Sequence, residues 1–112
     1  MVSKQLMAAS TRPIILAILS RGVDYGYSII QKVKETSGGN LEWRDGMLYP
    51  VLQRMEIDEL ISSTWKLSGG NRPRRYYTIT DRGRKELTGE LVSWRTVWQA
   101  LSRFTEPLLS ED

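Results

Sequence analysis

Basic side chains gather in one stretch of the 112-residue chain, between positions 66 and 85. That stretch contains a single acid, Asp81, and seven cations: Lys66, Arg72, Arg74, Arg75, Arg82, Arg84 and Lys85. Its net charge is therefore +6, whereas the whole chain has +3 and the remainder −3. Guanidinium and ammonium groups bind phosphates, so a positive charge concentrated in this way is typical of a nucleic-acid-binding surface.

The centre of the basic stretch reads GGNRPRRYYTIT, residues 69–80. Glycines let a chain turn close to DNA, arginines meet phosphates or a minor groove, and tyrosines brace a strand and offer hydroxyl donors. A solubilising loop tip is the alternative interpretation of the arginines. We favour phosphate binding because like charges without compensation repel one another.

Enzyme chemistry is disfavoured by composition. The chain has no histidine and no cysteine, which removes the usual general base, the commonest metal ligand and any thiolate site. The carboxylates lie mostly beside basic residues at helical spacing, as on a solvated surface. We therefore expect no enzyme activity, no cofactor and no metal.

The length suits one domain, and the content of 40% hydrophobic and 26% charged residues is ordinary for a soluble protein. No apolar run approaches the roughly 18 residues of a membrane span, and the first residues lack the apolar core of a secretory signal. A cytoplasmic location without membrane association is the default expectation.

Two helices are predicted in the first 40 residues. Thr11 and Pro13 resemble a helix start, with a possible extension toward the N-terminus, and the apolar run that follows ends at Gly22. Asp24 is the expected cap of a second helix, which ends at the glycines at positions 38 and 39.

A third helix is expected to begin with Asp45 as its cap, and Leu48, Leu52 and Met55 form one apolar stripe on it. The opposite face has no obvious internal use, and it comprises Gly46, Tyr49, Pro50, Gln53, Arg54 and Ile57. After it, residues 60–80 have the composition of an antiparallel hairpin, in which Tyr76 and Tyr77 point to opposite faces.

Thr80 is the expected cap of a last helix that closes at Pro107, before the acidic tail at 110–112. Apolar residues recur on it as a heptad seam, which needs a partner: Leu87, Leu91, Trp94, Trp98 and Leu101, widened by Val97 and Phe104. Both tryptophans suit a dimer core, and an imperfectly packed interface between them could also bind planar apolar molecules.

This order of elements predicts a mainly α (α+β) fold, a winged helix-turn-helix with a two-stranded wing and a C-terminal dimerisation helix. We expect a DNA-binding domain over residues 1–80, a dimerisation helix over 81–106 packed on it, and a tail over 107–112. The predicted DNA-binding residues are Tyr25, Gly46, Tyr49, Pro50, Gln53, Arg54, Arg72, Arg74 and Arg75. Tyr25 and Tyr49 could instead fill core positions, and Gln53 and Arg54 could be merely solvated.

Three motifs at consistent spacings resemble PadR-family transcriptional regulators: YGYSII at 25–30, GMLYPVLQRME at 46–56 and GGNRPRRYYTIT at 69–80. The match runs in register from about Arg12 to Leu87. The length and the single C-terminal helix resemble the short subfamily, which implies a homodimer, generally a repressor, that in some members responds to drugs or phenolic compounds. In multidrug-responsive members a tryptophan stacks on planar ligands, and Trp94 matches that position, whereas Trp98 is outside the pattern.

Two residues depart from the family pattern. Met47 stands where threonine is usual, so a hydroxyl contact to DNA is absent there. Glu59 stands where a glycine commonly ends the recognition helix, which makes a left-handed cap less comfortable and favours a different helix end.

These observations predict a homodimeric DNA-binding regulator, a repressor of an inverted-repeat operator, with an effector or dimer surface at Leu91, Trp94, Val97, Trp98 and Leu101. The expected partners are double-stranded DNA, a second copy of the chain and a small aromatic effector. The alternative is a winged-helix module that binds a protein through exposed Met47 and Ile57 without specific DNA binding.

Overall fold

The computed structural model describes residues 2–109 of the chain. Four helices and three strands follow in the order α1 (Lys4–Leu19), β1 (Asp24–Tyr25), α2 (Gly26–Thr36), α3 (Asp45–Ile57), β2 (Ile61–Ser68), β3 (Arg72–Ile79) and α4 (Asp81–Leu109). The winged-helix arrangement predicted from the sequence is confirmed. The acidic tail predicted at 110–112 lies outside the described residues.

The first helix begins earlier than Thr11, because Ser3 caps it. The Ser3 hydroxyl oxygen accepts a hydrogen bond of 3.1 Å from the backbone N–H of Leu6. The predicted start at Thr11 is therefore wrong, and the N-terminal extension is confirmed. Pro13 lies inside the helix.

Asp24 does not cap α2. It lies in β1, is 5% exposed, and its Oδ2 accepts a hydrogen bond of 2.6 Å from Lys32 Nζ. Tyr25 is the capping residue, and its side chain makes no capping bond. A carboxylate buried to this extent needs a charged partner, and Lys32 on α2 supplies it.

The third helix begins at Asp45, so Arg44 rather than Asp45 is its capping residue, and the acid lies in the first turn, where the helix dipole favours it. The helix nevertheless ends in a Schellman motif with Glu59 in the left-handed position, so the different helix end expected from Glu59 is wrong. Leu60 N–H bonds to the Met55 carbonyl at 2.9 Å and Glu59 N–H to the Glu56 carbonyl at 3.0 Å, while Glu59 has a φ of 64°.

We expect Glu59→Gly to raise the free energy of unfolding by about 1 kcal/mol, because a left-handed backbone strains any residue with a Cβ. Glu59→Ala keeps the Cβ and is the matched control, with little expected change. Urea unfolding of both variants checks this, and equal midpoints for the two variants would contradict it.

The hairpin forms the greater part of a three-stranded antiparallel sheet in the order β1-β3-β2. Tyr77 is buried and Tyr76 is half-buried, so the predicted division of the two tyrosines between opposite faces is confirmed. Strand β1 was not predicted. It pairs Asp24 with Tyr77 and Tyr25 with Tyr76, and so attaches the start of α2 to the wing.

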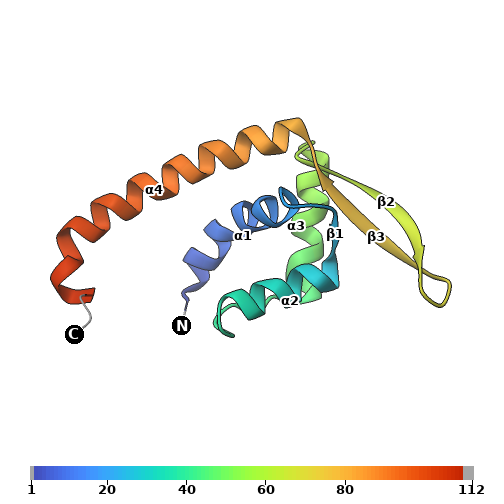
Figure 1. The fold of residues 1–112 in the computed structure, drawn as a ribbon, viewed down its shortest axis with the longest axis horizontal. Coiled ribbons are helices and arrows are strands. Elements are labelled where there is room, and N and C mark those ends of the chain that lie inside the picture. The colour runs from blue at the N-terminus through green and yellow to red at the C-terminus, as the bar shows by residue number, and fades with distance from the viewer. Residues whose placement is uncertain (1, 110–112) are drawn as a thin grey trace.

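The last helix is capped by Thr80 as predicted, since its Oγ1 accepts a hydrogen bond of 3.0 Å from Gly83 N–H. It continues through Pro107 to Leu109, so the predicted end at Pro107 is wrong. Figure 1 shows α4 crossing above α1 and extending well beyond it, on the side of the molecule opposite the hairpin.

The core lies where the three N-terminal helices meet the base of the sheet. Its fully buried side chains come from α1, α2, α3, the residue before β2 and the start of β2, and are Ile15, Leu16, Leu19, Ile29, Leu48, Leu52, Met55, Leu60 and Ile61. The predicted stripe of α3 is thus in the core, which leaves its opposite face free. Among residues 2–109, no helix combines the length and apolarity needed to cross a bilayer.

Candidate nucleic-acid interface

The outer face of α3 is exposed along its whole length. This face comprises Ile57 and the residues of α3 predicted to bind DNA, which are Gly46, Tyr49, Pro50, Gln53 and Arg54. Arg54 forms an ion pair of 3.4 Å with Asp58 one turn further on. A helix whose inner stripe is in the core and whose outer face is uncovered and presents Gln53 and Arg54 has the form of a recognition helix.

Tyr49 is fixed by the start of α2. A Cβ added at Gly26 would overlap the Tyr49 hydroxyl and ring, so only glycine allows this close approach. Burial, and secondarily the negative charge of Asp45, raise the pKa of the Tyr49 hydroxyl above its ordinary value. The hydroxyl therefore stays protonated at neutral pH and remains a hydrogen-bond donor.

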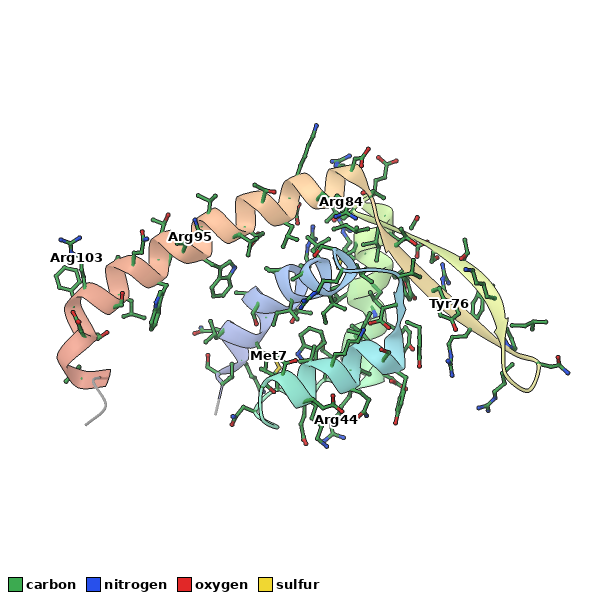
Figure 2. The ribbon with its side chains drawn as sticks, in the orientation of Figure 1. Met7, Arg44, Tyr76, Arg84, Arg95 and Arg103 are labelled. Carbon is green, nitrogen blue, oxygen red and sulfur yellow. The ribbon has the colours of Figure 1, made fainter. Side chains whose placement is uncertain are left out.

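Tyr25, Tyr76 and Arg74 form a stack at the junction of β1 and the wing. The two tyrosine rings meet edge to face with centroids 5.5 Å apart, and the Arg74 guanidinium lies 4.1 Å from the Tyr25 centroid. Tyr76 is labelled on the wing in Figure 2. Such stacking orients the Arg74 cation without neutralising its charge.

Arg75 is differently placed, because it is ion-paired. Its Nη2 lies 3.1 Å from Glu56 Oε1, and its Nε donates to Ser63 Oγ at 2.8 Å. Ser63 in turn donates to Glu56 Oε2 at 2.6 Å, and the Arg75 guanidinium lies 5.5 Å from the Trp65 ring centroid. This network joins the last turn of α3 to both strands of the wing.

The tip of the wing exposes Arg72. The turn before it uses left-handed backbone at Gly70, with a φ of 81°, and at Asn71, with a φ of 63°. Lys66, on the facing strand, lies 5.7 Å from the Tyr76 ring centroid. The arginines predicted to meet phosphates are therefore all on β3, at the tip (Arg72) and further along the strand (Arg74 and Arg75).

Two recesses separate the wing from the helices. The larger, of about 360 Å³, lies between the start of α2, α3 and the wing, and its lining includes Tyr25, Tyr49 and Arg74. The smaller, of about 260 Å³, is lined by Tyr49, Gln53, Glu56, Arg75 and Tyr77. The structure thus brings most of the predicted DNA-binding residues to one surface.

The seam residues of α4 have different environments. Leu87 is 8% exposed and belongs to the core of its own chain, whereas Leu101 is 52% exposed. The other exposed apolar residues of the seam and its flanks are Leu91, Val97, Trp98 and Phe104. Trp94 is half-buried, and its indole N–H donates to Glu90 at 3.1 Å.

Ion pairs between residues far apart in sequence, which the sequence did not predict, hold the elements together. Arg12 of α1 reaches Asp58 at 3.2 Å and Glu86 of α4 at 3.1 Å, and so ties the end of α3 to the start of α4. Partners far apart in sequence leave no local signal, so these contacts had no pattern to reveal them. Within the part of the chain that the structure describes, no cluster of acidic side chains has the form of a metal site.

This arrangement of three helices, a β-hairpin and a long terminal helix defines a winged helix-turn-helix protein. The family model for the transcriptional regulator PadR-like family matches residues 15–89, and the chain belongs to this family. The family consists of transcriptional regulators, in agreement with the prediction that the chain is not an enzyme.

Individual relatives agree. The negative transcriptional regulator PadR of Bacillus subtilis is 30% identical over 78 residues, which are 70% of this chain and 43% of that protein. A PadR-like regulator from Bacillus cereus has a similar structure, with a TM-score of 0.80, 30% identity and coverage of 96% of this chain and all of the other. The B. subtilis PadR structure in complex with operator DNA has a TM-score of 0.67 and 28% identity, over 72% of this chain and 46% of that one.

Proposed function

We propose that this regulator is a cytoplasmic homodimer that binds an inverted-repeat operator and represses transcription. In each subunit the outer face of α3 enters the major groove, and Arg72 and Arg74 on the wing bind the flanking phosphates. Two-fold symmetry of the protein then requires two-fold symmetry of the operator.

The observation on which the proposal rests is the surface formed by α3 and the wing. Gln53 and Arg54 are exposed on the helix, and Tyr25 orients the Arg74 cation beside it. Polar side chains on a helix can read base edges, while cations beside it bind the backbone. That the structurally similar PadR of B. subtilis binds operator DNA supports DNA binding by this chain.

Dimerisation is proposed to occur through α4, whose exposed apolar residues have no partner in the described part of the chain. Phe104 is 86% exposed and Leu101 is 52% exposed on a helix that extends beyond the rest of the subunit (Figure 1). Stripes of this kind are buried between paired helices in stable proteins. A second copy of α4 supplies a complementary apolar stripe.

We expect the double variant Val97→Glu/Leu101→Glu to be monomeric at concentrations where the wild type is a dimer, because two carboxylates cannot be buried in an apolar seam. Sedimentation velocity measures this. Thr96→Glu/Gln99→Glu places the same charges on the opposite, exposed face of α4 as a control. A wild type that sediments as a monomer would contradict the proposed dimer.

An effector site is proposed at the dimer interface near Trp94 and Trp98. A planar aromatic molecule that stacks there must bind the DNA-incompetent arrangement of the dimer more tightly than the competent one to relieve repression. Quenching of tryptophan fluorescence by planar aromatic compounds is the corresponding assay.

The test of the proposed function is a titration onto a fluorescent duplex from the region upstream of the protein's own gene, beside a shuffled duplex, at two salt concentrations. Preference for the native duplex, with binding that weakens as salt rises, is the expected result. Equal binding to both duplexes would place the operator elsewhere or indicate a non-specific DNA-binding protein. No binding to either would favour a protein-interaction module using the exposed Ile57. Met47, predicted to be exposed with it, is instead half-buried against the core.

A further inference from the structure

The network of Glu56, Ser63 and Arg75 places a carboxylate on the surface proposed to face DNA. Glu56 lies beside Gln53 and Tyr49 on the smaller recess, where a polyanion would be repelled by its charge. Its carboxylate nevertheless accepts hydrogen bonds from Arg75 Nη2, at 3.1 Å and 3.4 Å, and from Ser63 Oγ, at 2.6 Å. A carboxylate in this place therefore needs a role other than binding to DNA.

The three residues come from three different elements. Glu56 lies in the last turn of α3, Ser63 on β2 and Arg75 on β3, where Ser63 is paired with Tyr77 and Arg75 with Trp65. Glu56 thus holds both strands of the wing against the recognition helix. A ring of three hydrogen-bonded groups constrains direction as well as distance, since each bond restricts the geometry of the other two.

We propose that Glu56 is a positioning residue that determines operator specificity by fixing the angle of the wing relative to α3. With the angle fixed, phosphate binding by the wing and base recognition by α3 can occur together only on DNA of matching groove geometry. When the angle of the wing is not fixed, the wing binds phosphates wherever they lie, and the preference of the protein for the operator sequence decreases. This inference rests on the proposed function.

The variant Glu56→Gln is expected to have two opposite effects on DNA binding. Loss of a negative charge and release of Arg75 should strengthen binding to the shuffled duplex several-fold. The slope of log K against log salt concentration should steepen by the amount expected for about one more neutralised phosphate. The preference for the operator over the shuffled duplex should decrease about tenfold. A purely structural role would weaken binding to both duplexes equally.

Two further variants separate charge from geometry. Glu59→Gln removes an equivalent acid, whose ion pair with Arg82 at 3.4 Å is exposed. Binding of this variant to the shuffled duplex should therefore strengthen, while its preference for the operator is kept. Ser63→Ala breaks the ring without a change of charge, so operator preference should fall while the salt dependence stays the same. If the operator preference of Glu56→Gln equals that of Glu59→Gln, the inference is wrong.

A measurement without DNA keeps the inference testable if the wild type shows no operator preference. Because the chain has no cysteine, spin labels can be attached to single cysteines at Glu35 on α2 and Leu67 on the wing, both exposed, in protein diluted with unlabelled chains. Pulsed electron resonance should show a narrow distance distribution in the wild type and in Glu59→Gln, and a broader one in Glu56→Gln. Equal widths in all three would overturn the inference, whereas a wild type without operator preference would contradict only the proposed function.

Discussion

Replacement of Gly83 by alanine is expected to lower the free energy of unfolding by about 3 kcal/mol. Gly83 lies in the first turn of α4, and a Cβ added there would overlap the Leu60 carbonyl oxygen and a carbon of Ile79. That carbonyl cannot move freely, because it accepts a hydrogen bond of 3.0 Å from Thr80 N–H. The whole start of α4 would have to move away from the sheet.

Gly89 is the matched control, because it lies in the same helix with open space around the position of its missing Cβ. Gly89→Ala should raise the free energy of unfolding by about 1 kcal/mol through helix propensity alone. Both variants are unfolded in urea at one protein concentration, since the stability of an oligomer depends on concentration. Equal shifts in the two variants would show that the packing of α4 against Leu60 is not tight.

The type and order of the main elements could be predicted from sequence because each has a local signal. The stripe of Leu48, Leu52 and Met55 gives α3 its inner face, and all three are buried. Alternation in the hairpin likewise predicts that Tyr76 and Tyr77 point to opposite faces, and in the structure Tyr77 is the buried one. These signals depend on residues close in sequence, and the family resemblance agreed with them.

The errors occur where a local signal competes with a distant partner. Asp24 has the type and position of a helix cap, but Lys32 binds its carboxylate and β3 pairs with its backbone. Strand β1 has only two residues, too few for a periodic pattern to be recognised. Pro107 stands where a helix commonly closes, yet α4 continues to Leu109.

The candidate site shows the same limit. From the sequence, Arg72, Arg74 and Arg75 are equivalent cations, because charge density alone does not reveal pairing. In the structure Arg75 is bound to Glu56, whereas Arg74 lies over an aromatic ring that leaves its charge uncompensated. Charge removal at Arg75 would also break the ring of hydrogen bonds that joins the wing to α3, so it would not test phosphate binding alone.

The double variant Arg72→Ala/Arg74→Ala is accordingly expected to weaken binding to the operator and to the shuffled duplex alike, by about 100-fold at moderate salt. Removal of each phosphate-binding cation should also reduce the slope of log K against log salt concentration by about 0.9. The double variant should therefore have a slope that is shallower by about 1.8. Titrations at four salt concentrations measure both quantities.

A control must remove the same charge from another part of the molecule. Arg95 and Arg103 are exposed on α4, far from the wing in Figure 2, so Arg95→Ala/Arg103→Ala should leave the slope unchanged. Sedimentation of both variants verifies that each remains in the same oligomeric state as the wild type. If the two double variants lose affinity equally, net charge rather than the wing attracts DNA, because a long-range field depends on total charge whereas counterion release requires direct binding to phosphates.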